Sequence, residues 1–134
     1  MKKELCFIVE NKKLYSDKIL VTFNDFPIFF VCKDEDNNYY LVLCRDMENL
    51  EYIIVKSSAK DIYDMLIQKY SIKEVFLKPD FFYEVFGEIN LSSDRVNKLS
   101  SDRLDVSFLP NEDIYYEAQD ADDIDYMHDL ATKF

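Results

Sequence analysis

The sequence predicts an α+β fold: an antiparallel β-meander of three to five strands packed against two or three helices, with an acidic C-terminal helix. Three observations predict it. Apolar runs rich in aromatic and β-branched residues fill positions 4–55, the apolar period lengthens to that of a helix after Ser58, and acidic residues concentrate after position 104. At 134 residues the chain has the usual length of one domain, so we expect a single domain over residues 1–134.

The first expected strands are two short apolar runs near the start of the chain. Residues 4–9 and 18–23 have the composition of strands, and the polar stretch 11–17 separates them. Residues 52–55 are a later run of the same kind and would extend the meander.

A β-hairpin is the clearest local unit. Apolar runs at 27–32 and 39–44 flank an Asp- and Asn-rich turn at 33–38, and such side chains stabilise tight turns. Neither face of this hairpin is polar, so both faces must be covered. Helices on one side with further strands on the other would cover them, and so would a homodimer formed through the hairpin Pro27–Cys44.

Two helix starts follow. Ser58 has the position of an N-cap, and helical spacing continues to about Tyr70. Ser71 and Glu74 form a capping box that opens a second, shorter helical segment, which Pro79 stops.

The region after Pro79 gives weaker patterns. Residues 80–86 are aromatic and fit either a strand or a buried helical turn. Gly87, the only glycine of the chain, is expected at a positive φ or at a close approach of two backbones. Residues 90–103 are the most polar segment, and we interpret them as turns or successive N-caps.

Charge is unevenly distributed. The chain has 27 acidic and 16 basic residues, for a net charge of -11. Residues 1–104 contain 18 acidic and 15 basic side chains and form a near-neutral core, whereas residues 105–134 contain 9 acidic side chains and one lysine. This balance argues against direct binding of nucleic acid, because attraction to phosphate requires clustered Lys and Arg. A basic protein partner is expected instead.

The acidic C-terminal segment 105–134 also has helical spacing, and its helix could begin at Asp120. The apolar positions of this pattern are Ile114, Ala118, Ala121, Ile124, Met127 and Ala131. The polar side is either a solvated helix face or a binding surface, in which carboxylates supply charge and tyrosines supply rigid anchors for a partner rich in Arg and Lys. The candidate partner-binding residues are Asp113, Tyr115, Tyr116, Glu117, Asp120, Asp122, Asp123, Asp125, Tyr126 and Asp129.

The apolar runs and the cysteines predict the cellular compartment of the protein. The N-terminal apolar run is interrupted by Glu4 and ended by Glu10, unlike a secretory signal, and no run is long enough to span a membrane. Cys6, Cys32 and Cys44 are expected to be reduced core residues. We therefore expect a cytoplasmic protein without membrane association.

The sequence contains no complete catalytic or metal-binding motif. Asp34, Asp36 and Asn38 imitate half of a calcium loop, but its sixth position holds Tyr39 instead of glycine. His128 is the only histidine and has no nucleophile in a recognisable context. We expect no catalytic residue, no metal and no cofactor, although the many carboxylates leave acid–base chemistry open.

The hairpin region resembles a known family. The runs Asp25–Asp34, Tyr40–Cys44, Glu51–Val55 and Leu77–Pro79 are similar to a family of small uncharacterised domains from low-GC bacteria, over residues 20–86. The resemblance implies an α+β domain of bacterial, phage or plasmid source. It transfers no catalytic residue, and the acidic C-terminal segment lies outside it.

Two functions from different classes remain. We favour a non-enzymatic inhibitor of immunity, antitoxin or anti-defence type, whose acidic segment blocks a basic surface of its target, for example by mimicking nucleic acid where that surface binds it. The alternative is a small carboxylate- or metal-dependent enzyme or ligand-binding subunit. A structural homodimer is the third reading.

Overall fold

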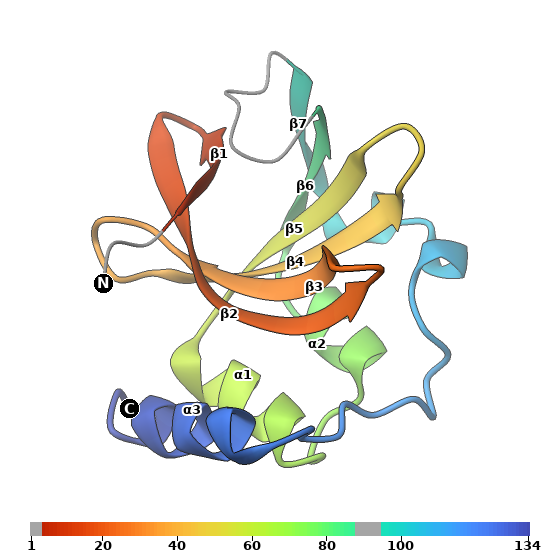
Figure 1. Cartoon of the computed structure of the whole chain (residues 1–134). Coiled ribbons are helices and arrows are strands. Elements are labelled where there is room, and N and C mark those ends of the chain that lie inside the picture. Colours follow the sequence, from red (N-terminus) through yellow and green to blue (C-terminus); the bar gives the residue numbers. More distant parts are fainter. Residues whose placement is uncertain (1–3, 88–94) are drawn as a thin grey trace.

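The computed structural model describes residues 4–87 and 95–134, which form one curled antiparallel sheet over three short α-helices (Figure 1). Each strand pairs with the next one along the chain, in the order β1 to β7. The strands are β1 Leu5–Val9, β2 Lys12–Phe23, β3 Phe26–Lys33, β4 Tyr39–Asp46, β5 Glu51–Ser57, β6 Phe81–Phe86 and β7 Arg95–Ser100. The α-helices are α1 Ala59–Leu66, α2 Ile72–Leu77 and α3 Ala121–Ala131, with single 3₁₀ turns at Ser101–Arg103 and Val106–Phe108.

The predicted α+β fold class was wrong. The described residues form a mostly β half-barrel of seven strands with short helices, instead of a meander of three to five strands packed on helices. Residues 80–86 fit either a strand or a helical turn by sequence, and the structure has strand β6 there. β7 begins within the segment 90–103, for which the sequence predicts turns or successive N-caps. Residues 88–94, which include the start of that segment, lie outside the described residues.

β2 is also longer than the apolar pattern predicted. It begins at Lys12 and includes most of the polar stretch 11–17. Its pairing with β3 shifts register between Ser16 and Lys18 and again between Ile19 and Val21. Such bulges disturb the alternation of inward and outward side chains and increase twist, so the strand curls without a regular two-residue pattern.

The predicted hairpin is confirmed as β3 and β4, with Lys33 opposite Tyr39 at its closed end. The carboxylate of Asp34 organises the turn. It accepts hydrogen bonds from the backbone N of Asp36 at 2.9 Å, from the backbone N of Asn38 at 3.0 Å and from the Tyr40 hydroxyl at 2.9 Å. Burial acts to raise the pKa of Asp34, but these hydrogen bonds outweigh it and the pKa is lowered.

Both faces of the hairpin are covered within one chain. One face packs on the helices, in a core that includes Phe29, Val31, Leu41, Ile62, Met65, Phe76 and Leu130. The other face lies inside the curl, in a core that includes Phe7, Leu14, Phe30, Cys32, Tyr40, Val42 and Tyr52. The hairpin Pro27–Cys44 therefore needs no second copy to bury its apolar side chains, and the homodimer stays a prediction.

Several local predictions are confirmed. Ser58 caps α1 by accepting from the backbone N of Asp61 at 3.0 Å, and Ser71 and Glu74 form the predicted capping box on α2. α1 ends at Leu66, before the expected end near Tyr70. Of the three cysteines expected in the core, Cys6 and Cys32 are buried free thiols, whereas Cys44 is a half-buried one. None of the described helices is both long and apolar enough to cross a membrane.

Candidate functional site

The C-terminal segment ends in a helix that begins where the sequence predicted. Asp120 is the N-cap of α3, and its carboxylate accepts from the backbone N of Asp123 at 3.1 Å. Asp122 and Asp123 follow in the first turn, where negative charge interacts favourably with the helix dipole. The helix lies at the base of the molecule beside α1 (Figure 1).

The predicted orientation of this helix was wrong. Ile114 and Ile124, assigned to its apolar side, are 46% and 41% exposed. The residues of α3 that are buried are Asp123 and Leu130, with Tyr126 and Met127 packed partly against the core. The helix is turned because one of its acids, Asp123, has partners inside the protein.

Asp123 anchors the helix to β2. Its carboxylate forms an ion pair with Lys18 Nζ at 2.9 Å and accepts from the Tyr116 hydroxyl and from the backbone N of Gln119, both at 2.7 Å. Burial acts to raise the pKa of Asp123, but the hydrogen bonds from Gln119, Tyr116 and Lys18 prevail and lower it. The buried carboxylate is therefore charged and fully partnered at neutral pH.

Two tyrosines complete this anchor. Tyr116 is 3% exposed, and its ring packs edge-on against Phe29 with centroids 6.3 Å apart. Tyr126 donates a 2.6 Å hydrogen bond to the carboxylate of Asp17 on β2. Burial and the neighbouring carboxylates raise the pKa of both phenols, so both remain protonated donors.

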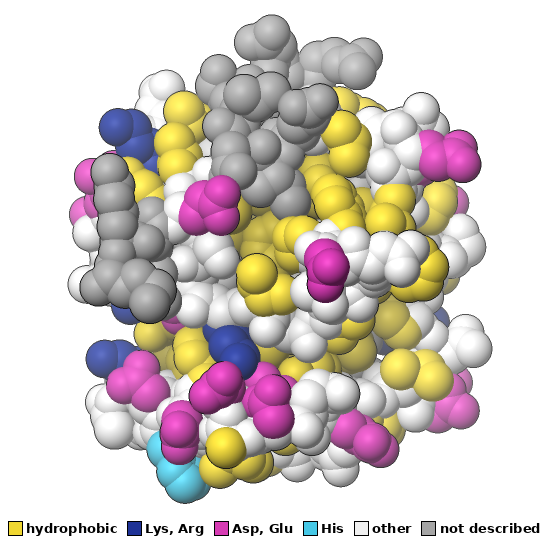
Figure 2. Space-filling view, viewed as in Figure 1, with side chains coloured by type: hydrophobic (Ala, Val, Ile, Leu, Met, Phe, Trp, Pro, Cys, Tyr) yellow, Lys and Arg dark blue, Asp and Glu magenta, His cyan; other side chains and the backbone are white. Residues whose placement is uncertain are grey.

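The structure thus separates the ten predicted partner-binding residues into two groups. Tyr116, Asp123 and Tyr126 hold the segment on the core, as described above. The other seven are exposed: Asp113, Tyr115, Glu117, Asp120, Asp122, Asp125 and Asp129. Together with the exposed Ile114 and Ile124 they form what we call the C-terminal face. Figure 2 shows acidic side chains gathered along the base of the molecule, where α3 lies, with apolar side chains among them.

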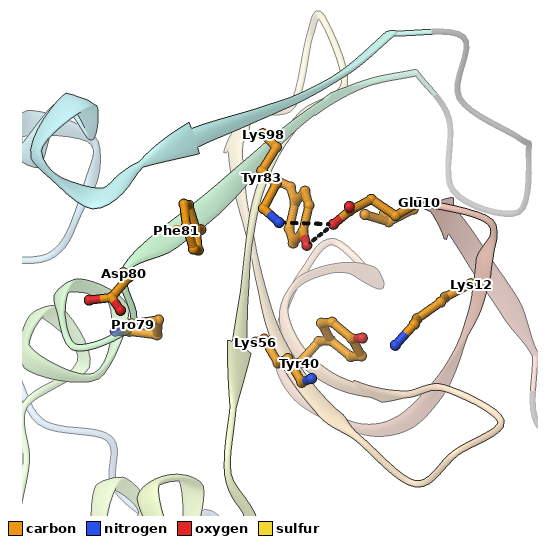
Figure 3. A pocket seen from close by; sticks show the side chains of 10 residues that line it. Glu10, Lys12, Tyr40, Lys56, Pro79, Asp80, Phe81, Tyr83 and Lys98 are labelled. Atoms are coloured by element: carbon orange, nitrogen blue, oxygen red, sulfur yellow. Dashed lines mark hydrogen bonds and ion pairs between the residues drawn. The ribbon is translucent and has the colours of Figure 1, made fainter.

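A second site, which no sequence pattern predicted, is a pocket of about 440 Å³ at the opening of the half-barrel (Figure 3). Lys12, Lys56 and Lys98 line it from β2, β5 and β7, together with Phe81 and Tyr83 of β6. These residues are widely separated along the chain, and only the curl of the sheet brings them together. No local motif could have revealed them.

Neither metal binding nor a relative assigns a chemistry to these sites. Within residues 4–87 and 95–134, no three His, Cys, Asp or Glu side chains are grouped so that they could hold a metal ion. His128 lies exposed on α3. Comparison of the chain with protein-family models, with curated proteins and with solved structures found no match in any of the three.

Proposed function

We propose that the protein is a non-enzymatic interaction protein, an inhibitor of immunity, antitoxin or anti-defence type, that binds a basic partner through its C-terminal face. The observation that carries the proposal is the composition of this face. Ile114, Tyr115 and Ile124 are 46%, 41% and 41% exposed, and the other members of the face are all exposed carboxylates.

Large exposed apolar side chains within a charged surface are typical of protein-binding surfaces. The apolar groups supply contact area, and the carboxylates supply attraction to Lys and Arg and speed the encounter. A basic surface that normally contacts nucleic acid suits this arrangement, since a row of carboxylates supplies the same charge as phosphates.

The anchor beneath the face supports the proposal. The buried contacts of Tyr116, Asp123 and Tyr126 fix the segment on β2, so its exposed side chains are held in place before a partner arrives. A preorganised surface loses less conformational entropy on binding than a flexible acidic tail does. We also place the protein in the cytoplasm, because its buried cysteines are free thiols.

The test compares three full-length proteins immobilised for capture from a bacterial lysate. They are the wild type, the face variant Asp122→Asn/Asp125→Asn/Asp129→Asn, and the control Glu35→Gln/Asp36→Asn/Glu48→Gln, which removes equal charge from exposed positions in the turns after β3 and β4. The face variant spares the cap Asp120 and the anchor Asp123, so that folding is preserved.

We expect a basic protein to be retained by the wild type and by the control but not by the face variant. Its binding should weaken as the salt concentration rises above about 0.1 M, because salt screens exposed charges. Retention of the same proteins by all three columns, or retention that does not respond to salt, would contradict the proposal.

A further inference from the structure

The pocket at the opening of the half-barrel lies where the sheet fails to close. β1 and β7 are the two edges of the sheet, and side chains link this end of the curl instead of a backbone ladder. The Tyr83 hydroxyl donates to the carboxylate of Glu10, which follows β1, and Lys98 Nζ of β7 lies 3.5 Å from the same carboxylate (Figure 3). The mouth of a barrel is a common place for ligand sites.

Lysine side chains are concentrated at this pocket. Three lysines line it against two carboxylates, those of Glu10 and Asp80, in a chain of net charge -11. Glu10 is already engaged by Tyr83 and Lys98. Figure 3 shows Asp80 on the other side of the pocket from Lys12, so it does not neutralise that end.

Two of the lysines have unused hydrogen-bonding capacity. Lys56 is exposed and has no ion pair with a carboxylate in the described part of the chain. Lys12 Nζ lies 3.9 Å from Asp34, whose oxygens already accept from Asn38 and Tyr40. Lys12 and Lys56 line the same pocket as Tyr40, and Figure 3 shows their side chains on either side of the Tyr40 side chain in this view. Two ammonium groups that line one pocket are suited to an anionic group with several acceptor oxygens.

An exposed aromatic ring also lines the pocket. Phe81 is 51% exposed although it belongs to a strand, and Lys98 Nζ lies 4.6 Å from the centroid of its ring. An exposed ring beside a cation offers a stacking surface to a flat, polar ring system. The pocket volume of about 440 Å³ lies in the range that small-molecule sites occupy.

We propose that this pocket binds a small organic anion that carries a flat ring, of the nucleoside monophosphate class. The phosphate lies between Lys12 and Lys56, and the base stacks on Phe81. This site is separate from the C-terminal face and does not depend on the function proposed for that face.

The test is titration of the isotope-labelled full-length protein with the monophosphates of adenosine, guanosine, cytidine and uridine, followed by amide chemical shifts. Adenosine and inorganic phosphate are the separate probes for ring and anion. We expect at least one nucleotide to shift the amides of Lys12, Lys56, Phe81 and Lys98, and each half-ligand to bind at least about tenfold more weakly.

Two variants and a matched control complete the experiment. Lys56→Gln and Phe81→Leu should each weaken nucleotide binding about tenfold or more. Lys13→Gln removes the same charge from an exposed neighbour that does not line the pocket, and it should bind like the wild type. Thermal melting of each variant checks folding. The proposal is overturned if none of the four nucleotides binds at millimolar concentration, if the shifts fall outside the pocket, or if Lys13→Gln weakens binding as much as Lys56→Gln.

Discussion

The Tyr116 hydroxyl donates a 2.7 Å hydrogen bond to the carboxylate of Asp123, seven residues later, and the same carboxylate lies 2.9 Å from Lys18 Nζ of β2. This contact decides which side of α3 faces the core. An acid thus takes the place that an apolar residue usually occupies in a surface helix, and the isoleucines of the segment remain exposed.

Loss of the negative charge of Asp123 should destabilise the protein. Asp123→Asn preserves the shape of the side chain but leaves Lys18, whose side chain is 19% exposed, without its counter-ion. We expect the free energy of unfolding, measured by urea titration, to fall by about 1 to 3 kcal/mol. The neighbouring Asp122→Asn is the control, because Asp122 is exposed; a change below about 0.5 kcal/mol is expected. Equal effects of the two variants would contradict the anchoring role.

The stability of the protein should depend on pH because of Asp34. Its pKa in the folded protein lies below the ordinary value of 3.8, because the hydrogen bonds of the hairpin turn outweigh burial. The folded state therefore binds fewer protons than the unfolded state in this range, and the contribution of Asp34 to stability is present above pH 3.8 and is lost as the pH falls through the lowered pKa.

The free energy of unfolding of Asp34→Asn should thus lie below that of the wild type at neutral pH, and the difference should shrink as the pH is lowered from about 5 towards 2. Chemical unfolding at each pH measures it. The exposed Glu35→Gln serves as the control, with little difference at any pH. If the difference in the free energy of unfolding between the wild type and Asp34→Asn stayed constant over this pH range, titration of Asp34 would not be the origin of the pH dependence.

The sequence predicted those parts of the fold that depend on contacts between residues close together in the chain. The hairpin of β3 and β4, the caps at Ser58 and Ser71 and the start of α3 after Asp120 all depend on residues close together in the chain. Their side chains bond the backbone of their own turn, so neighbouring residues suffice to identify them.

The curl of the sheet and strand β7 were not predicted, because they depend on contacts between residues far apart in the chain. β7 is an edge strand in which Asn97, Lys98 and Ser100 are exposed, so its sequence has the composition of a loop. The pocket needs the same curl, since Lys12 and Lys98 lie on strands near opposite edges of the sheet. For the C-terminal face, the sequence indicated the exposed acids but not which acid and which tyrosines are buried.

Arg45 should be a strong determinant of stability. Its guanidinium lies 2.8 Å from Glu84 and 2.9 Å from Glu51, and it also lies 5.0 Å from the centroid of the Phe108 ring. The side chain is 9% exposed and joins β4 to β5, to β6 and to the turn that holds Phe108.

Arg45→Met leaves two partly buried carboxylates without a counter-ion, so we expect the free energy of unfolding to fall by about 2 to 4 kcal/mol. Arg103→Met removes an exposed arginine and should change it by less than about 0.5 kcal/mol. Urea unfolding compares the two. If Arg45→Met were as stable as Arg103→Met, the bridging role would be refuted.

The turn between β2 and β3 offers a stabilising substitution. Asn24 and Asp25 connect the strands at φ values of 50° and 66°, both in the left-handed region. Tight hairpins with two such residues favour the sequence Asn-Gly, because glycine reaches positive φ without a steric cost. Asp25→Gly should raise the free energy of unfolding by about 0.5 to 1 kcal/mol. Asp25→Ala keeps the Cβ atom at this positive φ but lacks the short polar side chain that lets Asp tolerate the left-handed region, so it should lower the free energy of unfolding. Urea unfolding of the two variants measures both changes.

Replacement of Gly87, the only glycine of the chain, should lower the stability of the protein. Gly87 has a φ of 140°, and its backbone N donates a 3.0 Å hydrogen bond to the Leu50 carbonyl, which ties the end of β6 to the turn before β5. A Cβ atom is poorly tolerated at this φ, so Gly87→Ala should lower the free energy of unfolding by about 1 to 3 kcal/mol. Thermal and urea unfolding measure the loss. An unchanged stability would mean that the chain relaxes to a negative φ there, and the amide of residue 87 would then lose its protection from hydrogen exchange.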